Sequence, residues 1–183
     1  MSKVASALNG AHFDGFARIR EIGPLGMITL RAKPGVPGLA EVVAAVTGTA
    51  LPAQRRVEVA GDKAAAWMSP DEYLLILPYA GVKAALATLA EKLAGQHHLA
   101  VDVSDARAVF RIEGDKADDV LQKLAPADLA ALEPGEIRRT RIAQVAGAFW
   151  KADGGYTLVC FRSVASYVMG LLTHSAQSGS ELF

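Results

Sequence analysis

The sequence of 183 residues is poor in several features that would identify a class of protein. It contains one cysteine, Cys160, which excludes an internal disulfide and fits a reducing compartment. Its 19 basic and 19 acidic side chains leave no net charge, so the basic excess of a nucleic-acid-binding protein is missing. No apolar run approaches the ~20 residues of a membrane-spanning helix. We therefore expect a protein that binds neither nucleic acid nor a membrane.

The N-terminal stretch MSKVASALNGAHFDG lacks the long apolar core of a secretory signal, and we expect a cytoplasmic protein. Residues 1–15 and 175–183 are rich in small and polar side chains, so we expect both ends to be flexible. Hydrophobic residues make up 51% of the chain, and a partner that covers an apolar surface would explain this high share. Without net charge, the isolated chain has little repulsion to oppose self-association.

Residue types that form catalytic or metal sites are few and scattered. The adjacent His97 and His98 would point to opposite faces of a strand, and the other two histidines lie near the chain ends. Cys160 lies in the apolar run TLVCF with no neighbouring base to lower the pKa of its thiol. The stretches GPLG, PGVPG and DGG lack the glycine spacing of a phosphate-binding loop. We therefore predict no catalytic, cofactor-binding or metal-binding residue in this chain.

Hydrophobic periodicity predicts four amphipathic helices with apolar side chains three or four residues apart, at 39–46, 82–93, 115–126 and 163–172. Asp115 is expected to be the N-cap of the third helix, and the fourth is expected to open at Ser163. Apolar runs between turn residues predict strands at 26–32, 55–60, 73–77, 108–113, 140–146 and 156–162. Residues 146–150 extend the fifth strand into a hairpin through the turn Asp153-Gly154-Gly155.

The stretch AAWMSPDEYLLILP, residues 65–78, has a counterpart later in the chain. Trp67 lies six residues before Tyr73, and Trp150 lies six residues before Tyr156. In both cases turn residues fill the gap and an apolar strand and a helix follow, and the two pairs lie 83 residues apart. A constant offset between different elements is what a duplication leaves in a sequence. We interpret this stretch as part of a duplicated framework rather than as the wall of an active site.

Two further observations bear on the duplication. Arg31 and Arg111 each end an apolar strand before a helix and lie 80 residues apart, close to the offset of the tryptophans. The tetrapeptide GDKA starts at 61 and again at 114, a conflicting offset that we attribute to reuse of the same turn chemistry. We predict an α+β fold of two pseudo-symmetric strand-helix-strand-strand-helix units, residues 16–97 and 98–174, in one compact domain.

Arginines are concentrated in the second half of the chain. Arg162-Ser163 joins a strand to a helix start, where a guanidinium beside free helix N–H groups could hold an anion or a partner's carboxylate. The alternative is an Arg–Asp pair that stabilises this junction, because Asp102 and Asp105 also lie in this half. The residues that we predict as contacts to a partner or an anion are Arg107, Arg141, Arg162 and Ser163.

The stretches VDVSDARAVFRIEGDKADDVLQKLAPADL and TRIAQVAGAFWKADGGYTLVCFRSVASYVMGLL resemble the gamma subunit of heterotetrameric sarcosine oxidase, and WMSPDEYLLILP fits the same pattern. The resemblance implies an enzyme of alpha, beta, gamma and delta subunits that oxidatively demethylates sarcosine to glycine. It produces hydrogen peroxide and passes the one-carbon unit to tetrahydrofolate. It implies FAD, FMN, NAD, zinc and tetrahydrofolate in the partner subunits and no cofactor in this chain. The implied fold is similar to the folate-binding domain of glycine-cleavage aminomethyltransferases.

The sequence supports a leading function and two alternatives. The first is a non-catalytic structural subunit that packs against the flavin- and folate-bearing alpha subunit of a sarcosine oxidase. The second is a stand-alone folate-binding, aminomethyltransferase-like one-carbon enzyme. The Asp-x-Ser segment at Asp102 resembles theirs only superficially, and no catalytic role is assigned to it. The third is a free-standing module that binds an anionic ligand through the arginine-rich half.

Overall fold

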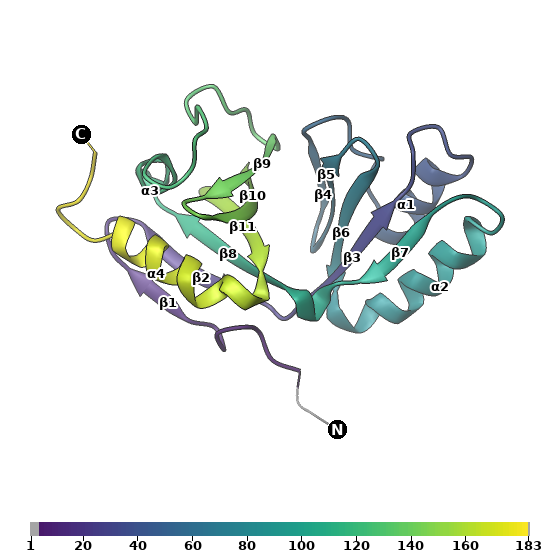
Figure 1. Cartoon of the computed structure of the whole chain (residues 1–183), viewed down its shortest axis with the longest axis horizontal. Coiled ribbons are helices and arrows are strands. Elements are labelled where there is room, and N and C mark those ends of the chain that lie inside the picture. The colour runs from purple at the N-terminus through teal and green to yellow at the C-terminus, as the bar shows by residue number, and fades with distance from the viewer. Residues whose placement is uncertain (1–3, 183) are drawn as a thin grey trace. The chain divides into compact units, whose positions relative to one another are not determined.

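The structure is a computed structural model that describes residues 4–182, so that part of each predicted flexible end, residues 1–3 and 183, lies outside the described residues (Figure 1). The chain forms two compact units. The central unit is Leu25–Ser104, and the flanking unit combines the N-terminal residues up to Pro24 with Asp105 and the residues after it. Within residues 4–182 no helix is both long and apolar enough to cross a bilayer.

The central unit is a five-stranded antiparallel sheet with two helices. In chain order its elements are β3 (Leu25–Arg31), α1 (Leu39–Thr47), β4 (Val57–Ala60), β5 (Lys63–Ser69), β6 (Glu72–Pro78), the 3₁₀ turn η1 (Tyr79–Gly81), α2 (Val82–Lys92) and β7 (Leu99–Asp102). The strand order is β4-β5-β6-β3-β7. Alternate apolar side chains of β3 and β6 pack in one core with α1 and α2, and those between them, Met27, Leu74 and Ile76, are buried as well. The core includes Ile28, Leu30, Val42, Val43, Leu75 and Leu89.

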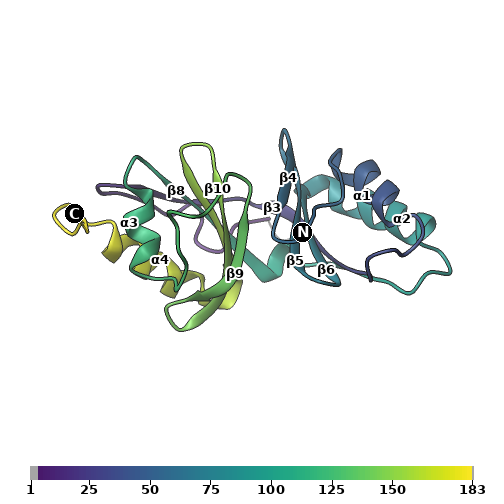
Figure 2. The same ribbon diagram turned by 90° about the horizontal axis from the view of Figure 1, so that it is seen from above.

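The flanking unit is a six-stranded antiparallel sheet, also with two helices. Its elements are β1 (His12–Asp14), β2 (Arg18–Ile22), the 3₁₀ turn η2 (Ser104–Ala106) at the junction, β8 (Arg107–Glu113), α3 (Ala117–Gln122), β9 (Ile137–Ile142), β10 (Val145–Ala152), β11 (Gly155–Phe161), the 3₁₀ turn η3 (Arg162–Val164) and α4 (Ala165–Ser175). The strand order is β1-β2-β8-β11-β10-β9. Figure 2 shows α3 and α4 of this unit from a second direction.

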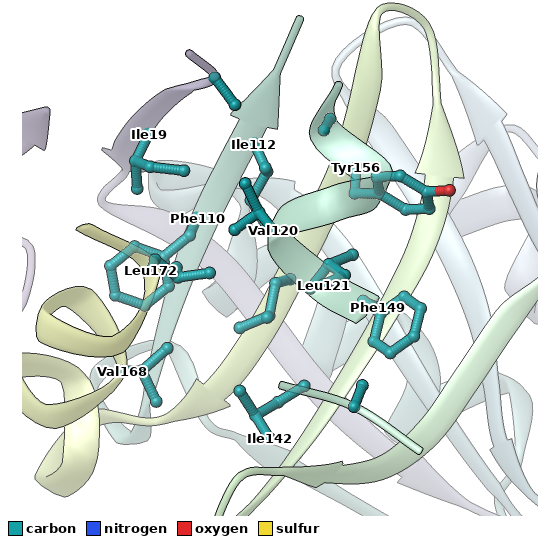
Figure 3. Close-up of a cluster of buried hydrophobic side chains, with 14 of the residues drawn as sticks. Ile19, Phe110, Ile112, Val120, Leu121, Ile142, Phe149, Tyr156, Val168 and Leu172 are labelled. Carbon is teal, nitrogen blue, oxygen red and sulfur yellow. The ribbon is translucent and has the colours of Figure 1, made fainter. Parts of the chain in front are cut away.

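The core of the flanking unit lies between its sheet and its two helices (Figure 3). Phe110 and Ile112 project from β8 toward Val120 of α3 and Leu172 of α4, and all four are fully buried. Phe149 of β10 contacts Tyr156 edge to face, with ring centroids 6.1 Å apart, a favoured geometry for aromatic pairs. The apolar spacing seen in the sequence therefore describes this covered face of the sheet.

The predicted α+β class and the duplication are confirmed, with two more strands than expected in the central unit and three more in the flanking unit. Each unit has the order strand, helix, three strands, helix, because β5 and β10 form full hairpin arms. The fifth strand comes from opposite sides of the sequence. In the central unit β7 follows α2 and pairs with β3, whereas in the flanking unit β2 comes from the N-terminus and pairs with β8. The predicted units 16–97 and 98–174 therefore differ from the observed ones.

Strand register corrects two equivalences that the sequence suggested. Tyr73 pairs with Leu30 and Tyr156 pairs with Ile112, so the two tyrosines occupy the same position in their units. Trp67 lies opposite Tyr73, but the residue opposite Tyr156 is Lys151 and not Trp150. A β-bulge between Trp67 and Ser69 adds a residue to β5, and this extra residue hides the true offset.

Arg31 and Arg111 are not equivalent either, because they lie at different positions along the matching strands. Arg31 is opposite Glu72, the first residue of β6, and Arg111 is opposite Thr157, the third residue of β11. The two GDKA tetrapeptides do follow strands, one between β4 and β5 and the other after β8. Both glycines adopt positive φ angles, 61° in the hairpin and 125° before α3, so the two turns share the need for glycine but not the same conformation.

Several element boundaries also differ from those predicted. Helix α3 begins at Ala117 after Lys116, so Asp115 is not its N-cap, and Ser163 lies in η3 before α4 begins at Ala165. The predicted strand 140–146 is wrong. It contains the turn between β9 and β10, where Ala143 adopts a φ of 49°. The expected flexible segment 1–15 contains β1, which pairs with β2.

Candidate functional site

Arg162 holds the N-terminal segment of the flanking unit. Its guanidinium donates hydrogen bonds to the carbonyl oxygen of Ala5, at 3.2 Å from both terminal nitrogens, and to that of Ser6 at 3.1 Å. A planar guanidinium suits this bridging of two neighbouring carbonyl groups. The junction is thus stabilised by backbone carbonyls rather than by the aspartates considered from sequence. Contact between Arg162 and a partner or an anion stays a prediction.

Glu21 binds the same N-terminal segment, through backbone N–H groups and a hydroxyl rather than through carbonyl oxygens. Its side chain is on β2 and is 6% exposed. The carboxylate accepts hydrogen bonds from the backbone N–H groups of Leu8 and Gly10, both at 2.9 Å, and from the hydroxyl of Ser6 at 2.8 Å. These three donors offset the cost of burying the carboxylate. Glu21 and Arg162 together bind residues 5–10, which we name the N-terminal strap.

Arg107 lies next to Arg162 in the fold, because it pairs with Phe161 across β8 and β11. Its guanidinium carbon lies 4.2 Å from the centroid of the Phe161 ring, a cation–π contact. The Phe161 side chain is 46% exposed, so this contact forms part of the surface. Arg107 and Phe161 thus present a cation and an apolar ring side by side.

Arg141 and Ser163, the other two predicted contact residues, are both exposed. Arg141 is on the edge strand β9 opposite Ala146, two strands away from β8 in the sheet order. Ser163 is in η3, directly after Arg162. The structure therefore brings Arg107 close to the Arg162-Ser163 junction but places Arg141 at the far edge of the sheet. Their role in binding a partner or an anion stays a prediction.

Groups with chemical reactivity do not converge within residues 4–182. No three His, Cys, Asp or Glu side chains in this range are arranged so that they could hold a metal ion. Cys160 is buried, and burial raises the pKa of its thiol to about 12, although the charge of Arg107 opposes this shift. A thiol with this pKa remains protonated at neutral pH and is a poor nucleophile.

Asp102, in the segment VDVSD, has structural partners. One of its carboxylate oxygens accepts hydrogen bonds from the backbone N–H of Ser104 at 2.9 Å and from the Ser104 hydroxyl at 2.6 Å. That hydroxyl oxygen in turn accepts a hydrogen bond from the backbone N–H of Met27, also at 2.9 Å. The three residues thereby fix the end of β7 against the start of β3.

The central unit contains a cavity of about 460 Å³, within the size range of ligand pockets. We name it the Trp67 pocket, and its lining residues are Pro34, Leu51, Pro52, Ala53, Gln54, Trp67, Pro70 and Tyr73. Most of the wall comes from prolines, the two aromatic rings and Leu51, and no lysine, arginine, aspartate or glutamate lines it. The sequence had drawn attention to Trp67 and Tyr73 as framework residues but gave no sign of a pocket beside them.

Tyr73 and Gln54 supply polar side chains to the wall of this pocket. Tyr73 is 2% exposed, and burial, followed by the charge of Asp71, raises the pKa of its hydroxyl. The hydroxyl therefore remains protonated and can donate a hydrogen bond at any physiological pH. Trp67 is half-buried and packs against the core of the unit, and its backbone N–H donates a hydrogen bond to the carbonyl of Arg56 at 3.0 Å.

Comparison with known proteins gives consistent matches in sequence and in fold. Residues 31–177 match the family described as "Sarcosine oxidase, gamma subunit family". The sarcosine oxidase subunit gamma of Corynebacterium sp. (strain U-96) is 37% identical over 155 residues, which cover 81% of this chain and 74% of the relative.

Two solved structures are similar to this chain. A chain of the heterotetrameric sarcosine oxidase from Corynebacterium sp. U-96, in complex with pyrrole 2-carboxylate, matches with a TM-score of 0.79 and 28% identity. The match covers 87% of this chain and 83% of that chain. The glycine cleavage system aminomethyltransferase T from Bartonella henselae matches with a TM-score of 0.63 at 13% identity, covering 86% of this chain and 45% of that chain. This second likeness shows the fold alone.

Proposed function

Because the chain belongs to the sarcosine oxidase gamma subunit family, we propose that it serves as the gamma subunit of a heterotetrameric sarcosine oxidase. The observation that carries this proposal is the combined match in sequence and fold to relatives of that name and to a chain of such a complex. Its partners are then the alpha, beta and delta subunits, and the assembly oxidatively demethylates sarcosine to glycine. A single cysteine fits assembly in the cytoplasm.

Within this assembly the chain acts as a structural subunit, and the cofactors belong to its partners. FAD, FMN, NAD and tetrahydrofolate are then carried by the larger subunits, and zinc by the smallest one. The high pKa of the Cys160 thiol and the structural engagement of Asp102 support a role without chemistry. The chain then contributes surface to the complex, and packs against the subunit that carries the flavin and folate sites.

Exposed apolar side chains supply surface for such contacts. Leu99 and Val101 are 54% and 42% exposed and project from the same face of the edge strand β7. On the flanking unit, the ring of Phe161 beside Arg107 has the composition that protein interfaces favour, an aromatic residue with an arginine. A partner that covers these side chains removes apolar area from water, which favours association.

The test is co-expression with genes for the other three subunits, followed by purification through a tag on the largest one. We expect this chain to co-purify in a fixed ratio and to be required for a stable complex that oxidises sarcosine and releases hydrogen peroxide. The isolated chain serves as control and should show neither turnover nor bound flavin. Purification of an active, stable complex that excludes this chain would contradict the proposal, as would sarcosine oxidation by the chain alone.

A further inference from the structure

The Trp67 pocket corresponds to a region that the other unit fills with its own side chains. Tyr73 and Tyr156 occupy equivalent positions, as their strand pairing shows. Beside Tyr73 the segment between α1 and β4 has nine residues, 48–56, and four of its members line the pocket. In the flanking unit the segment between α3 and β9 has fourteen residues, 123–136. The two units therefore differ in length where the pocket lies.

The extra residues of the longer segment carry leucines into the core. Leu129 and Leu132 are 1% and 3% exposed and belong to the same buried cluster as Tyr156 and Phe149. The segment then reaches Lys151, the residue opposite Tyr156, through a hydrogen bond from the N–H of Gly135 to its carbonyl at 3.1 Å. In the central unit the N–H of Trp67, opposite Tyr73, makes the matching contact with its own shorter segment. The same framework is thus filled by aliphatic side chains in one unit and left open in the other.

The polar character of the pocket indicates what would complement it. Its wall is more apolar than polar and carries no charged side chain, and its polar side chains are Gln54 and Tyr73, whose hydroxyl is protonated. Tyr73 lines the pocket, so a segment that enters it can bring an acceptor such as a peptide carbonyl toward this hydroxyl. Aromatic and proline-lined grooves of this kind bind extended peptide segments, with rings against apolar side chains and donors toward carbonyl oxygens.

We propose that the Trp67 pocket anchors an extended segment of a partner subunit that inserts leucine-like aliphatic or proline side chains beside Tyr73. This inference rests on the proposed function, since the segment belongs to a subunit of the same complex. The side chains of this segment fill the space beside Tyr73, as Leu129 and Leu132 fill the space beside Tyr156 within the flanking unit. A rigid pocket that buries an anchoring side chain is the usual centre of binding energy in an interface.

A competition experiment tests the proposal with the complex itself. Wild-type and variant chains, distinguished by different tags, are co-expressed with the three partner subunits, and their ratio in the purified complex is measured by mass spectrometry. Ala53→Phe fills the pocket from its own exposed loop, much as the leucines fill the flanking unit. Its matched control is Ala130→Phe, which adds the same ring to an exposed site in the corresponding loop of the other unit. Tyr73→Phe removes only the hydroxyl and leaves the packing of the ring unchanged.

We expect Ala53→Phe to enter the complex about tenfold less than wild type, and Ala130→Phe to enter equally. Tyr73→Phe should enter about threefold less, the effect of one hydrogen bond, and its melting temperature should match that of wild type. If Ala53→Phe destabilises the chain, the ratio of Tyr73→Phe to wild type in the complex becomes the test of the pocket. Equal incorporation of both pocket variants overturns the pocket proposal while the subunit role stands. Absence of wild-type chain from the complex overturns the subunit role and, with it, the proposed anchor.

Discussion

Replacing Arg162 with alanine separates two roles for this residue, binding of an external anion and anchoring of the N-terminal strap. The side chain makes three hydrogen bonds to two carbonyl oxygens of the strap, at 3.1 to 3.2 Å. Hydrogen bonds from a charged donor contribute more than neutral ones, but water can replace the donor because Ala5 is exposed and Ser6 is half-buried. We therefore expect a loss of about 1–2 kcal/mol, confined to attachment of the strap.

This loss should appear as local opening rather than global unfolding, because residues 5–10 can detach while the sheet stays intact. The sensitive probes are the amides of Leu8 and Gly10, which donate to the Glu21 carboxylate. Their hydrogen exchange in Arg162→Ala should become about tenfold faster, the ratio that corresponds to about 1.4 kcal/mol. The melting temperature should fall by only a few degrees.

Arg162→Lys is the matched control, since it keeps the positive charge but cannot bridge two carbonyls with a planar group. It should give an intermediate exchange rate. Unchanged exchange at Leu8 and Gly10 in Arg162→Ala would refute the anchoring role. The same result, combined with a lower yield of assembled complex, would instead support contact between Arg162 and a partner. The two roles are therefore distinguished by which measurement responds.

Three further predictions follow from single contacts in the structure, one of them with a matched control variant. Gly155→Ala places a methyl group 1.9 Å from a backbone carbonyl oxygen of β8 and should lower the free energy of unfolding by more than about 4 kcal/mol in chemical denaturation. The control Gly154→Ala meets no atom within 4 Å and should lower it by about 1 kcal/mol, because of the positive φ at this position. The buried Tyr156 hydroxyl lacks a hydrogen bond of normal geometry, although burial and then the nearby Asp118 raise its pKa, so Tyr156→Phe should show no loss and up to about 1 kcal/mol of gain in denaturation. A clear loss would show that the hydroxyl bonds to Asp118. Burial raises the pKa of Glu113, but the hydrogen bonds and charge of Arg20 outweigh burial, so the pKa is lowered. The stabilisation of the fold by the Glu113 carboxylate is therefore present at neutral pH and lost as the pH falls through that pKa. Glu113→Gln should therefore melt below wild type at pH 7, and a constant difference down to about pH 3 would contradict this account.

The elements that the sequence predicted correctly have strong apolar patterns. Helix α1 carries four apolar side chains at helical spacing, and its C-terminal Gly48 adopts the left-handed φ of 72° expected at such an end. Strands β6 and β11 are nearly continuous apolar runs. By contrast, β5 has the sequence KAAAWMS, and alanine has no preference for strands that would reveal it. The short strands β2 and β7 are polar or exposed on one side, so their periodicity is too brief to detect.

The register of the duplication could not be read from sequence offsets. Insertions differ from one element to the next, and a single bulge in β5 shifts Trp67 onto the position of Lys151. Only hydrogen-bonded pairing shows which residues are equivalent. The Trp67 pocket escaped prediction for a related reason. It results from a difference in length between two segments, 48–56 and 123–136, and such a difference has meaning only after the units are aligned.

The candidate contact residues illustrate a different limit. The arginine-rich character of the second half was visible, and so was the junction at Arg162. Its partners, Ala5 and Ser6, are backbone carbonyls more than 150 residues away, and no residue type marks them. The sequence therefore indicated where a guanidinium would be needed but not what it would bind.

The duplication also explains the acidic residue in VDVSD without a reaction. Asp102 pairs with Ile28 on β3, and Glu21 pairs with Phe110 on β8. The two acidic positions are equivalent, because Ile28 and Phe110 each lie two residues before the strand partner of the tyrosine in their unit. Both carboxylates accept hydrogen bonds from backbone N–H groups of a neighbouring segment, Ser104 in one unit and the N-terminal strap in the other. In each unit the carboxylate on this strand satisfies backbone N–H groups of an adjoining segment that lies outside the sheet. A position that holds the chain together in both copies needs no catalytic role in one of them.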